Sequence, residues 1–302
     1  MIRSLRIEVP ATSANIGPGY DSFGLALGLV DSLTLTVHDA PVDTETVVTV
    51  QGESADELPR DRSHLIVRVL GEVLAELSPE THRRFIDRIT LESVNRIPHS
   101  RGLGSSAAAV VAGIALAGAL SEAAGGPRLS RAEILERAAV IEGHPDNAAP
   151  AVVGGLTISL SDPARAWTVP VRTIGEVTVL VPEVRLDTKT ARGAIPQDIA
   201  HAVAAGNSAR TGLLVHALTT DPSALLEATV DELHQEFRRA AYPESMDLVD
   251  SLRARGIPAV ISGAGPTVLA LTDSVPAEAV PAGVRALTVP IAEGGFRLSA
   301  EV

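Results

Sequence analysis

The sequence predicts a two-domain α+β protein. A chain of 302 residues, 45% of them hydrophobic, is long enough to form one large or two ordinary domains. Segments with the residue pattern of strands and segments with that of helices are mixed along its length. A polar stretch that contains a proline, residues 161–167, suits a connector. We therefore expect one domain over residues 1–165 and a second over residues 166–302.

Strands are predicted in the first domain where alternating or β-branched residues are bounded by Pro, Gly or Asp. These runs are residues 2–9, 33–37, 46–50 and 90–94. Between the last two, apolar residues at helical spacing predict an amphipathic helix over 63–77. Ser63 is its expected N-cap, and Ser78-Pro79 is its expected stop.

Two further helices are predicted in this domain. Residues 102–120 carry no charge and reach the length of a membrane span, but most of them are Ala, Gly, Ser and Val. A helix with small residues on every face is typical of the buried centre of a domain, and we expect it there. The second helix covers 130–141, where Ser130 and Glu133 match a capping box.

The second domain is also predicted to mix strands and helices. The expected strands are 176–182, 257–261 and a pair within 267–291, and the expected helices are 197–219, 223–240 and 244–255.

Composition excludes several classes of function. With 25 Lys+Arg against 37 Asp+Glu and no basic run, the chain should bind neither nucleic acid nor an anionic membrane. An anionic substrate must then be bound by local donors. The absence of cysteine excludes disulfides, thiolate metal sites and cysteine nucleophiles. The N-terminal residues carry no export signal, so we expect a cytoplasmic protein.

The strongest local motif lies between a predicted strand and the uncharged helix. It reads Pro98-His99-Ser100-Arg101-Gly102-Leu103-Gly104-Ser105-Ser106-Ala107. Glycines let the backbone approach a ligand closely, and a helix N-terminus offers unpaired N–H groups, so the segment is predicted to bind the phosphates of a nucleotide. Its serines suit either N-caps or contacts to a phosphate-bound Mg²⁺. The Gly-Lys-Ser/Thr ending of a Walker A loop is missing.

This motif closely resembles the second motif of the GHMP kinases. Residues 10–21, Pro-Ala-Thr-Ser-Ala-Asn-Ile-Gly-Pro-Gly-Tyr-Asp, resemble the first motif in its homoserine-kinase form. Residues 262–267, Ser-Gly-Ala-Gly-Pro-Thr, are similar to the third motif, a loop near the nucleotide phosphates. The resemblance covers essentially the whole chain. It implies an N-terminal domain like ribosomal protein S5 domain 2, a ferredoxin-like C-terminal domain, and an active site in the cleft between them.

The resemblance also implies the ligands and the residues that hold them. ATP, with Mg²⁺, would bind the loop 98–107 together with Gly263 and Gly265, and an aliphatic adenine pocket would lie near His64 and Leu65. The implied metal ligands are Ser106 and Glu136. The side-chain hydroxyl of L-homoserine would be the phosphoryl acceptor, in threonine biosynthesis. The residues implied to contact homoserine are Asn15, Asp21, His144, Asn147, Thr188, Arg192 and Arg238, with Arg239 as the alternative to Arg238. A homodimer is implied by similarity alone.

Asn147 bears on the mechanism. Related kinases carry an aspartate here that can accept the proton of the attacking hydroxyl, whereas an amide cannot act as a base at neutral pH. We therefore expect catalysis by positioning and charge stabilisation, with Asn147, Thr188 and Arg192 as the catalytic residues. Two alternatives stay open. One is a GHMP kinase for another small alcohol, such as shikimate, mevalonate or a related isoprenoid precursor; the other is a catalytically silent sensor of an amino acid.

Overall fold

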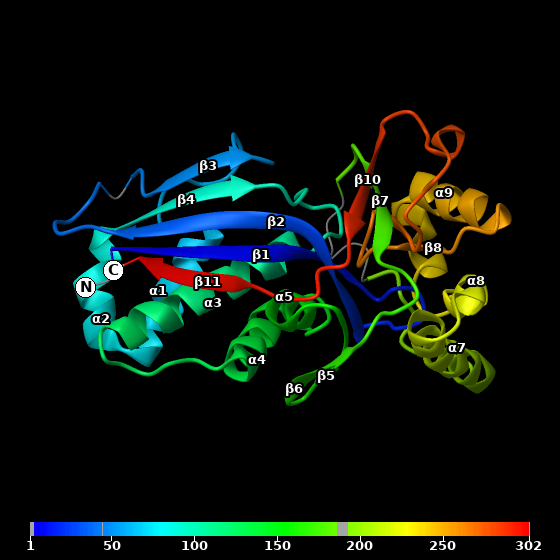
Figure 1. Cartoon of the computed structure of the whole chain (residues 1–302), viewed down its shortest axis with the longest axis horizontal. Coiled ribbons are helices and arrows are strands. Elements are labelled where there is room, and N and C mark those ends of the chain that lie inside the picture. Colours follow the sequence, from blue (N-terminus) through cyan, green and yellow to red (C-terminus); the bar gives the residue numbers. More distant parts are fainter. Residues whose placement is uncertain (1–2, 44, 186–192, 302) are drawn as a thin grey trace.

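The computed structural model describes residues 3–43, 45–185 and 193–301 and has two lobes, each built around a β-sheet (Figure 1). The larger sheet has seven strands in the order β11-β1-β2-β4-β3, and β2 also pairs with β5, which pairs with β6. These strands are β1 (Ser4–Ala14), β2 (Phe23–Val37), β3 (Val48–Gly52), β4 (Ile89–Asn95), β5 (Leu156–Ser161), β6 (Ala164–Val169) and β11 (Arg297–Glu301). Only β3 and β4 run parallel. Mixed helices and sheets in two lobes confirm the predicted fold class.

Alternation along β1 and β2 gives the larger sheet its buried face. Leu5 and Ile7 are fully buried and pair across the ladder with Leu35 and Leu33. Helices cover that face (Figure 1). They are α1 (Leu65–Leu77), α2 (Pro79–Phe85), α3 (Ser105–Ala123), α4 (Arg131–Glu142) and α5 (Ala148–Val153).

The smaller sheet forms the second lobe. Its four antiparallel strands, in order, are β10 (Val284–Pro290), β7 (Glu176–Pro182), β9 (Val268–Ala270) and β8 (Ala259–Ile261). The helices of this lobe are α7 (His201–Thr219), α8 (Leu225–Ala228) and α9 (Pro243–Ala254). The two strands predicted within 267–291 are confirmed as β9 and β10, and β7 lies between them in the sheet.

Helix α3 lies at the centre of the first lobe, as its small residues predict. It is long and apolar enough to cross a membrane, but 72% of its most apolar 18-residue window is buried inside the protein. Gly113 lets it approach α1 closely. A Cβ added at this glycine would lie 2.9 Å from both the carbonyl oxygen of Ile66 and the Cβ of Val69. The expected buried helix is therefore confirmed.

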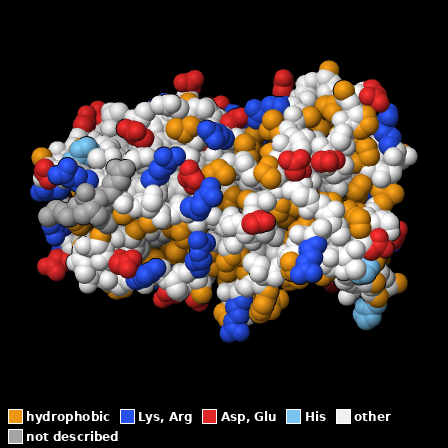
Figure 2. All heavy atoms as spheres, in the orientation of Figure 1, with side chains coloured by type: hydrophobic (Ala, Val, Ile, Leu, Met, Phe, Trp, Pro, Cys, Tyr) orange, Lys and Arg blue, Asp and Glu red, His pale blue; other side chains and the backbone are white. Residues whose placement is uncertain are grey.

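One hydrophobic core runs through both lobes. Alongside residues of the first lobe it contains Val179 and Leu269 of the smaller sheet and Leu214 of α7. A smaller cluster around Leu252 lies beneath α9. Figure 2 shows hydrophobic side chains gathered along the junction of the lobes, with acidic and basic side chains interspersed over the rest of this face. The lobes therefore share their main core.

One predicted helix start is wrong for a local reason, whereas a predicted stop and a predicted capping box are confirmed. Helix α1 begins at Leu65 with His64 at the N-cap position, because the Ser63 hydroxyl donates to Asp61 Oδ1 at 2.6 Å instead of capping the helix. Pro79 does end α1, but it also occupies the first turn of α2, where proline needs no N–H partner. The capping box of Ser130 and Glu133 at the start of α4 is confirmed.

Two longer predictions also fail. Instead of one helix over 223–240, the chain forms α8 and two short 3₁₀ turns. The carboxylate of Asp231 accepts the backbone N–H groups of residues 233–235 and replaces the helical pattern there. The expected connector 161–167 is the turn and part of the β5–β6 hairpin. The domain boundary at residue 165 stays a prediction. Strand β6 extends across this residue, and β11, at the end of the chain, pairs with β1 in the larger sheet.

Candidate active site

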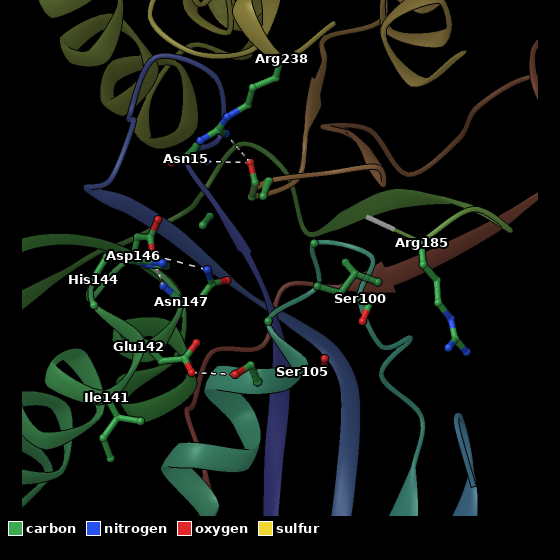
Figure 3. Close-up of a pocket in the computed structure, with 18 residues that line it drawn as sticks. Asn15, Ser100, Ser105, Ile141, Glu142, His144, Asp146, Asn147, Arg185 and Arg238 are labelled. Atoms are coloured by element: carbon green, nitrogen blue, oxygen red, sulfur yellow. Dashed lines mark hydrogen bonds and ion pairs between the residues drawn. The ribbon is translucent and has the colours of Figure 1, made fainter. Parts of the chain in front are cut away.

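A cavity of about 820 Å³ lies where the two lobes meet. Figure 3 shows that Arg238 and Asn15 lie at one end and the N-terminus of α3 at the other, with His144, Asp146 and Asn147 between them. The lining residues are Ala14, Asn15, Ser100, Gly102–Ser106, Ile141–His144, Asp146, Asn147, Arg185, Arg238, Gly263 and Ala264.

The glycine loop has a conformation that only glycine allows. Gly102 and Gly104 have φ of 76° and 68°. A Cβ on Gly104 would lie 1.9 Å from Thr12 Oγ1, and one on Gly102 would lie 2.3 Å from the carbonyl oxygen of Ser262. Gly104 is the N-cap of α3 and makes no side-chain cap hydrogen bond. The first turn of a 19-residue helix therefore presents its N–H groups and the positive end of its dipole to the cavity.

The predicted ATP-binding residues divide into two groups. Ser100, Gly102, Leu103, Gly104, Ser105, Ser106 and Gly263 line the cavity, whereas Pro98, His99, Arg101, Ala107 and Gly265 do not. Arg101 is turned away from it: the guanidinium donates to the carbonyl oxygens of Pro182 at 2.9 Å and Glu183 at 2.8 Å. It therefore connects the glycine loop to the end of β7, and its expected contact with ATP lacks support.

Hydrogen bonds join the first motif (residues 10–21) and the third motif (residues 262–267) beside the glycine loop (residues 98–107). Ser262 Oγ donates to the carbonyl oxygen of Gly102 at 2.6 Å, and Gly263 N donates to the carbonyl oxygen of Ala14 at 3.1 Å. Asn15, in a left-handed turn with φ of 70°, donates from Nδ2 to the Gly263 carbonyl at 2.9 Å. Its Oδ1 accepts the N–H of Asp21 at 2.9 Å. Asn15 lines the cavity, and Asp21 does not.

Hydrogen bonds fix the side chain of Asn147 at both ends. The Thr12 hydroxyl donates to Asn147 Oδ1 at 2.8 Å. Asp146, only 2% exposed, accepts from His144 Nδ1, from the Asn147 backbone N–H at 2.9 Å and from Asn147 Nδ2 at 3.4 Å. The amide oxygen therefore faces Thr12, and the amide nitrogen faces the side of Asp146.

The carboxylate beside Ser106 is Glu142. Ser106 Oγ donates to Glu142 Oε1 at 2.7 Å, and burial raises the pKa of Glu142 although this hydrogen bond lowers it. Glu136, the ligand implied by the resemblance, is exposed and does not line the cavity. From residue 136 to residue 142 an α-helix turns by about 240°, so the two side chains leave α4 on different faces. Sequence reasoning missed Glu142, although it begins the run 142–147, Glu-Gly-His-Pro-Asp-Asn, which contains the predicted residues His144 and Asn147.

Arg238 and Arg239 have different surroundings. Arg238 is 2% exposed and lines the cavity. Arg239 forms ion pairs with Glu236 at 2.8 Å and Asp250 at 2.9 Å on the surface of the second lobe. Arg238 is therefore the arginine of the pair that can reach a ligand. The predicted residues Thr188 and Arg192 lie outside the described residues.

A second cavity, of about 320 Å³, adjoins the first and shares Ser100, Ser105 and Ser106 with it. Apolar side chains line most of it, namely Val9, Leu33, Leu58, Pro59, Leu65, Ile66, Ala108 and Ala109. His64, expected near the adenine, lines it too, and so does His99, one of the predicted ATP-binding residues. Asp31 also reaches it, and Asp31 Oδ1 accepts the N–H groups of Arg96 at 2.6 Å and Ile97 at 2.9 Å. A flat apolar group attached to phosphates suits this pocket.

Comparison with known proteins identifies the class that this fold and loop define. The family model described as GHMP kinases N terminal domain matches residues 64–155, and that described as GHMP kinases C terminal matches residues 214–287. Homoserine kinases of Streptomyces avermitilis and Streptomyces coelicolor are each 46% identical, and each alignment covers 92% of this chain and 88% of the relative. The chain therefore belongs to the homoserine kinase family of the GHMP kinases.

Solved structures agree with this assignment. The homoserine kinase of Cytophaga hutchinsonii superposes with a TM-score of 0.81 at 26% identity, covering 99% of this chain and 98% of that one. The mevalonate kinase of L. major superposes with a TM-score of 0.64 at 13% identity, covering 94% of this chain and 95% of that one. At that identity it supports the fold alone.

Proposed function

We propose that the protein is an ATP-dependent kinase that transfers the γ-phosphoryl group to the side-chain hydroxyl of L-homoserine, giving O-phospho-L-homoserine for threonine biosynthesis. The observation that carries the proposal is the shared cavity. The open N-terminus of α3 suits phosphate at one end, and the buried Arg238 suits a carboxylate at the other. The 46% identity to named homoserine kinases supports the same acceptor.

ATP would bind across both cavities. Its phosphates would lie on the backbone N–H groups of the glycine loop, and its adenine in the apolar pocket beside His64 and Leu65. The three shared serines place the pocket directly beside the loop, as a nucleoside triphosphate requires.

Mg²⁺ would be held by Ser106 and Glu142 together with phosphate oxygens. Hydroxyl and carboxylate oxygens are the ligands that Mg²⁺ prefers, and the ion usually takes few of them from protein. Among the described residues, no three His, Cys, Asp or Glu side chains gather as a complete metal site, which fits an ion that shares its coordination with phosphates and water. When bound, the ion would neutralise charge on the phosphates.

Arg238 would pair with the α-carboxylate of homoserine, and Asn15 and His144 would contact its other polar groups. Thr188 and Arg192, which the resemblance implies as substrate contacts, would complete this end of the site. Asn147 would donate an amide N–H to the acceptor hydroxyl, since its oxygen already accepts from Thr12.

No carboxylate base is assigned to this step. A loose phosphoryl-transfer transition state needs little help from a base, and the hydroxyl proton would pass late to a γ-phosphate oxygen. This hypothesis rests on the amide at residue 147. An Asn147→Asp variant that turned over a hundredfold faster would overturn it. By similarity we also infer a cytoplasmic homodimer.

The test of function is a coupled ADP-release assay with Mg²⁺-ATP and a panel of L-homoserine, L-threonine, L-serine, shikimate and mevalonate. We expect a strong preference for homoserine, with phosphorus NMR placing the phosphate on the side-chain oxygen. Preference for another alcohol would refute the substrate. Absence of transfer to every alcohol would refute the kinase and favour a sensor.

A further inference from the structure

A fully buried histidine lies behind the arginine that lines the cavity. The Nε2 atom of His234 is 2.9 Å from the carbonyl oxygen of Gly17, and its Nδ1 atom is 3.3 Å from Arg238 NH1. A carbonyl can only accept a hydrogen bond, and a guanidinium can only donate. Both contacts are satisfied together only by a neutral imidazole that carries its proton on Nε2.

The surroundings of His234 hold the ring in place. The Asp231 carboxylate accepts the backbone N–H of His234 at 3.1 Å and so fixes the turn that carries it. The ring of Tyr20 stacks on the imidazole, with ring centres 5.2 Å apart and planes 28° apart. The Arg238 guanidinium carbon lies 5.5 Å from the centre of the same Tyr20 ring. His234 and Arg238 therefore both pack against the ring of Tyr20, which belongs to the first motif.

Charges around the ring favour its neutral form. Burial is the largest influence and lowers the pKa of His234, and the positive Arg238 acts in the same direction. The nearby carboxylates of Asp231 and Asp21 act in the opposite direction but do not outweigh burial. Nδ1 is then available as an acceptor at neutral pH.

We propose that His234 is a positioning residue that orients Arg238 toward the carboxylate of an amino-acid substrate by accepting a hydrogen bond at Nδ1. A guanidinium fixed before binding loses less conformational freedom when it pairs with a carboxylate. Arg238 also contacts the Gly263 carbonyl at 3.4 Å, so His234 and the third motif together hold NH1. This inference rests on the proposed function, in which Arg238 binds the carboxylate of homoserine.

Two substitutions distinguish the roles of the two ring nitrogen atoms of His234. His234→Asn keeps an acceptor near the position of Nδ1, whereas His234→Gln keeps a donor near Nε2 and loses the acceptor. We expect the Gln variant to raise the KM for homoserine about tenfold or more, because a hydrogen bond to a charged group is lost, and to leave the KM for ATP unchanged. The Asn variant should raise the homoserine KM by less than about threefold. His216→Asn, at an exposed position of α7, is the matched control.

A purely structural role would give a different result. It would lower the melting temperature and the active fraction of both variants, and so kcat, without changing either KM. A Gln variant with the homoserine KM of the unaltered enzyme would also overturn the proposal. If the unaltered enzyme does not phosphorylate homoserine, the proposed function is refuted before any His234 variant is compared.

A second measurement uses the unaltered protein and needs no variant to fold. Ring ¹⁵N NMR of histidine-labelled protein near neutral pH should show His234, distinguished from the other buried histidine, His64, by its contact with the Tyr20 ring, protonated on Nε2 alone, with a ring proton that exchanges slowly. Absence of such a histidine, or a buried ring protonated on both nitrogens, would exclude the acceptor at Nδ1.

Discussion

Glu136 and Glu142 share one helix, yet only Glu142 reaches Ser106, which makes them a matched pair of test positions. We expect Glu142→Gln to lower kcat/KM on the order of 10²-fold, because a charged oxygen beside the phosphates is lost. The Mg²⁺ concentration for half-maximal rate should rise as well. Glu136→Gln should leave both unchanged. The check is the initial rate titrated with Mg²⁺ for both variants; a larger effect at Glu136 would restore the ligand implied by sequence.

Asp31 gives a prediction about stability. Burial raises its pKa from 3.8 to about 6, so the folded protein favours the protonated carboxyl. Its stabilising contribution is complete below pH 3.8 and is lost as the pH rises through about 6. An Asp31→Asn variant does not lose this stability as the pH rises, because its amide does not ionise. Its side-chain oxygen can still accept the backbone N–H groups of Arg96 and Ile97. Its advantage in unfolding free energy over the unaltered protein should grow by about 1.5 kcal/mol between about pH 5 and pH 7.5. Urea titrations at both pH values measure it; an unchanging difference would contradict it.

Single residues were predictable from sequence where a motif is local. Asn15, His144, Asn147 and Arg238 were expected near a ligand, and all four line the cavity. The direction in which a side chain points was harder to predict. Motif spacing does not show which face of α4 carries a glutamate. Nor does it show that the long side chain of Arg101 turns toward β7.

At the scale of an element, the contact between α1 and α3 depends on a missing methyl group. Gly113→Ala would place a Cβ 2.9 Å from the carbonyl oxygen of Ile66. We expect this overpacking to destabilise the protein by about 1–3 kcal/mol despite the better helix propensity of alanine.

The control for this substitution is Gly212→Ala in α7, where an added Cβ has no atom within 4 Å. It should stabilise the protein by about 0.5–1 kcal/mol. Chemical denaturation of both variants measures the difference. Stabilisation by Gly113→Ala would mean that the two helices can separate at little cost.

Elements were predictable where their signals are local. The capping box of Ser130 begins α4 as expected, because both of its hydrogen bonds form within four residues. The helix predicted over 223–240 fails because one side chain, Asp231, takes the backbone N–H groups that a helix would use. Strands β6 and β11 depend on partners in the larger sheet, and local residue patterns do not reveal such partners.

At the scale of the molecule, the shared core predicts that the two lobes unfold together. Val179 and Leu214 of the second lobe belong to the same buried cluster as the first lobe. Breaking one lobe would therefore expose apolar surface of the other. We expect one calorimetric transition, with equal calorimetric and van 't Hoff enthalpies. Two separable transitions would show that the lobes are independent.

The mixture of strand and helix patterns predicts the α+β class, but composition allows one large or two ordinary domains, and the way the chain divides between the lobes does not follow from sequence. A chain divided in two at residue 165 would give each lobe one continuous segment. The observed sheet instead takes its edge strand from residues 297–301, because pairing with β1 satisfies backbone groups that no sequence pattern assigns to a partner.

This returning strand has a consequence for synthesis on the ribosome. β1 emerges first, but its outer edge is not paired until β11 has been translated, after the whole second lobe. For that interval a growing chain exposes a row of free backbone donors and acceptors, the kind of edge at which chains aggregate. Arg6 and Glu8 stand on this edge at alternate positions, and charges there discourage pairing with other chains. The charged pattern of β1 thus protects the nascent protein until β11 covers this edge.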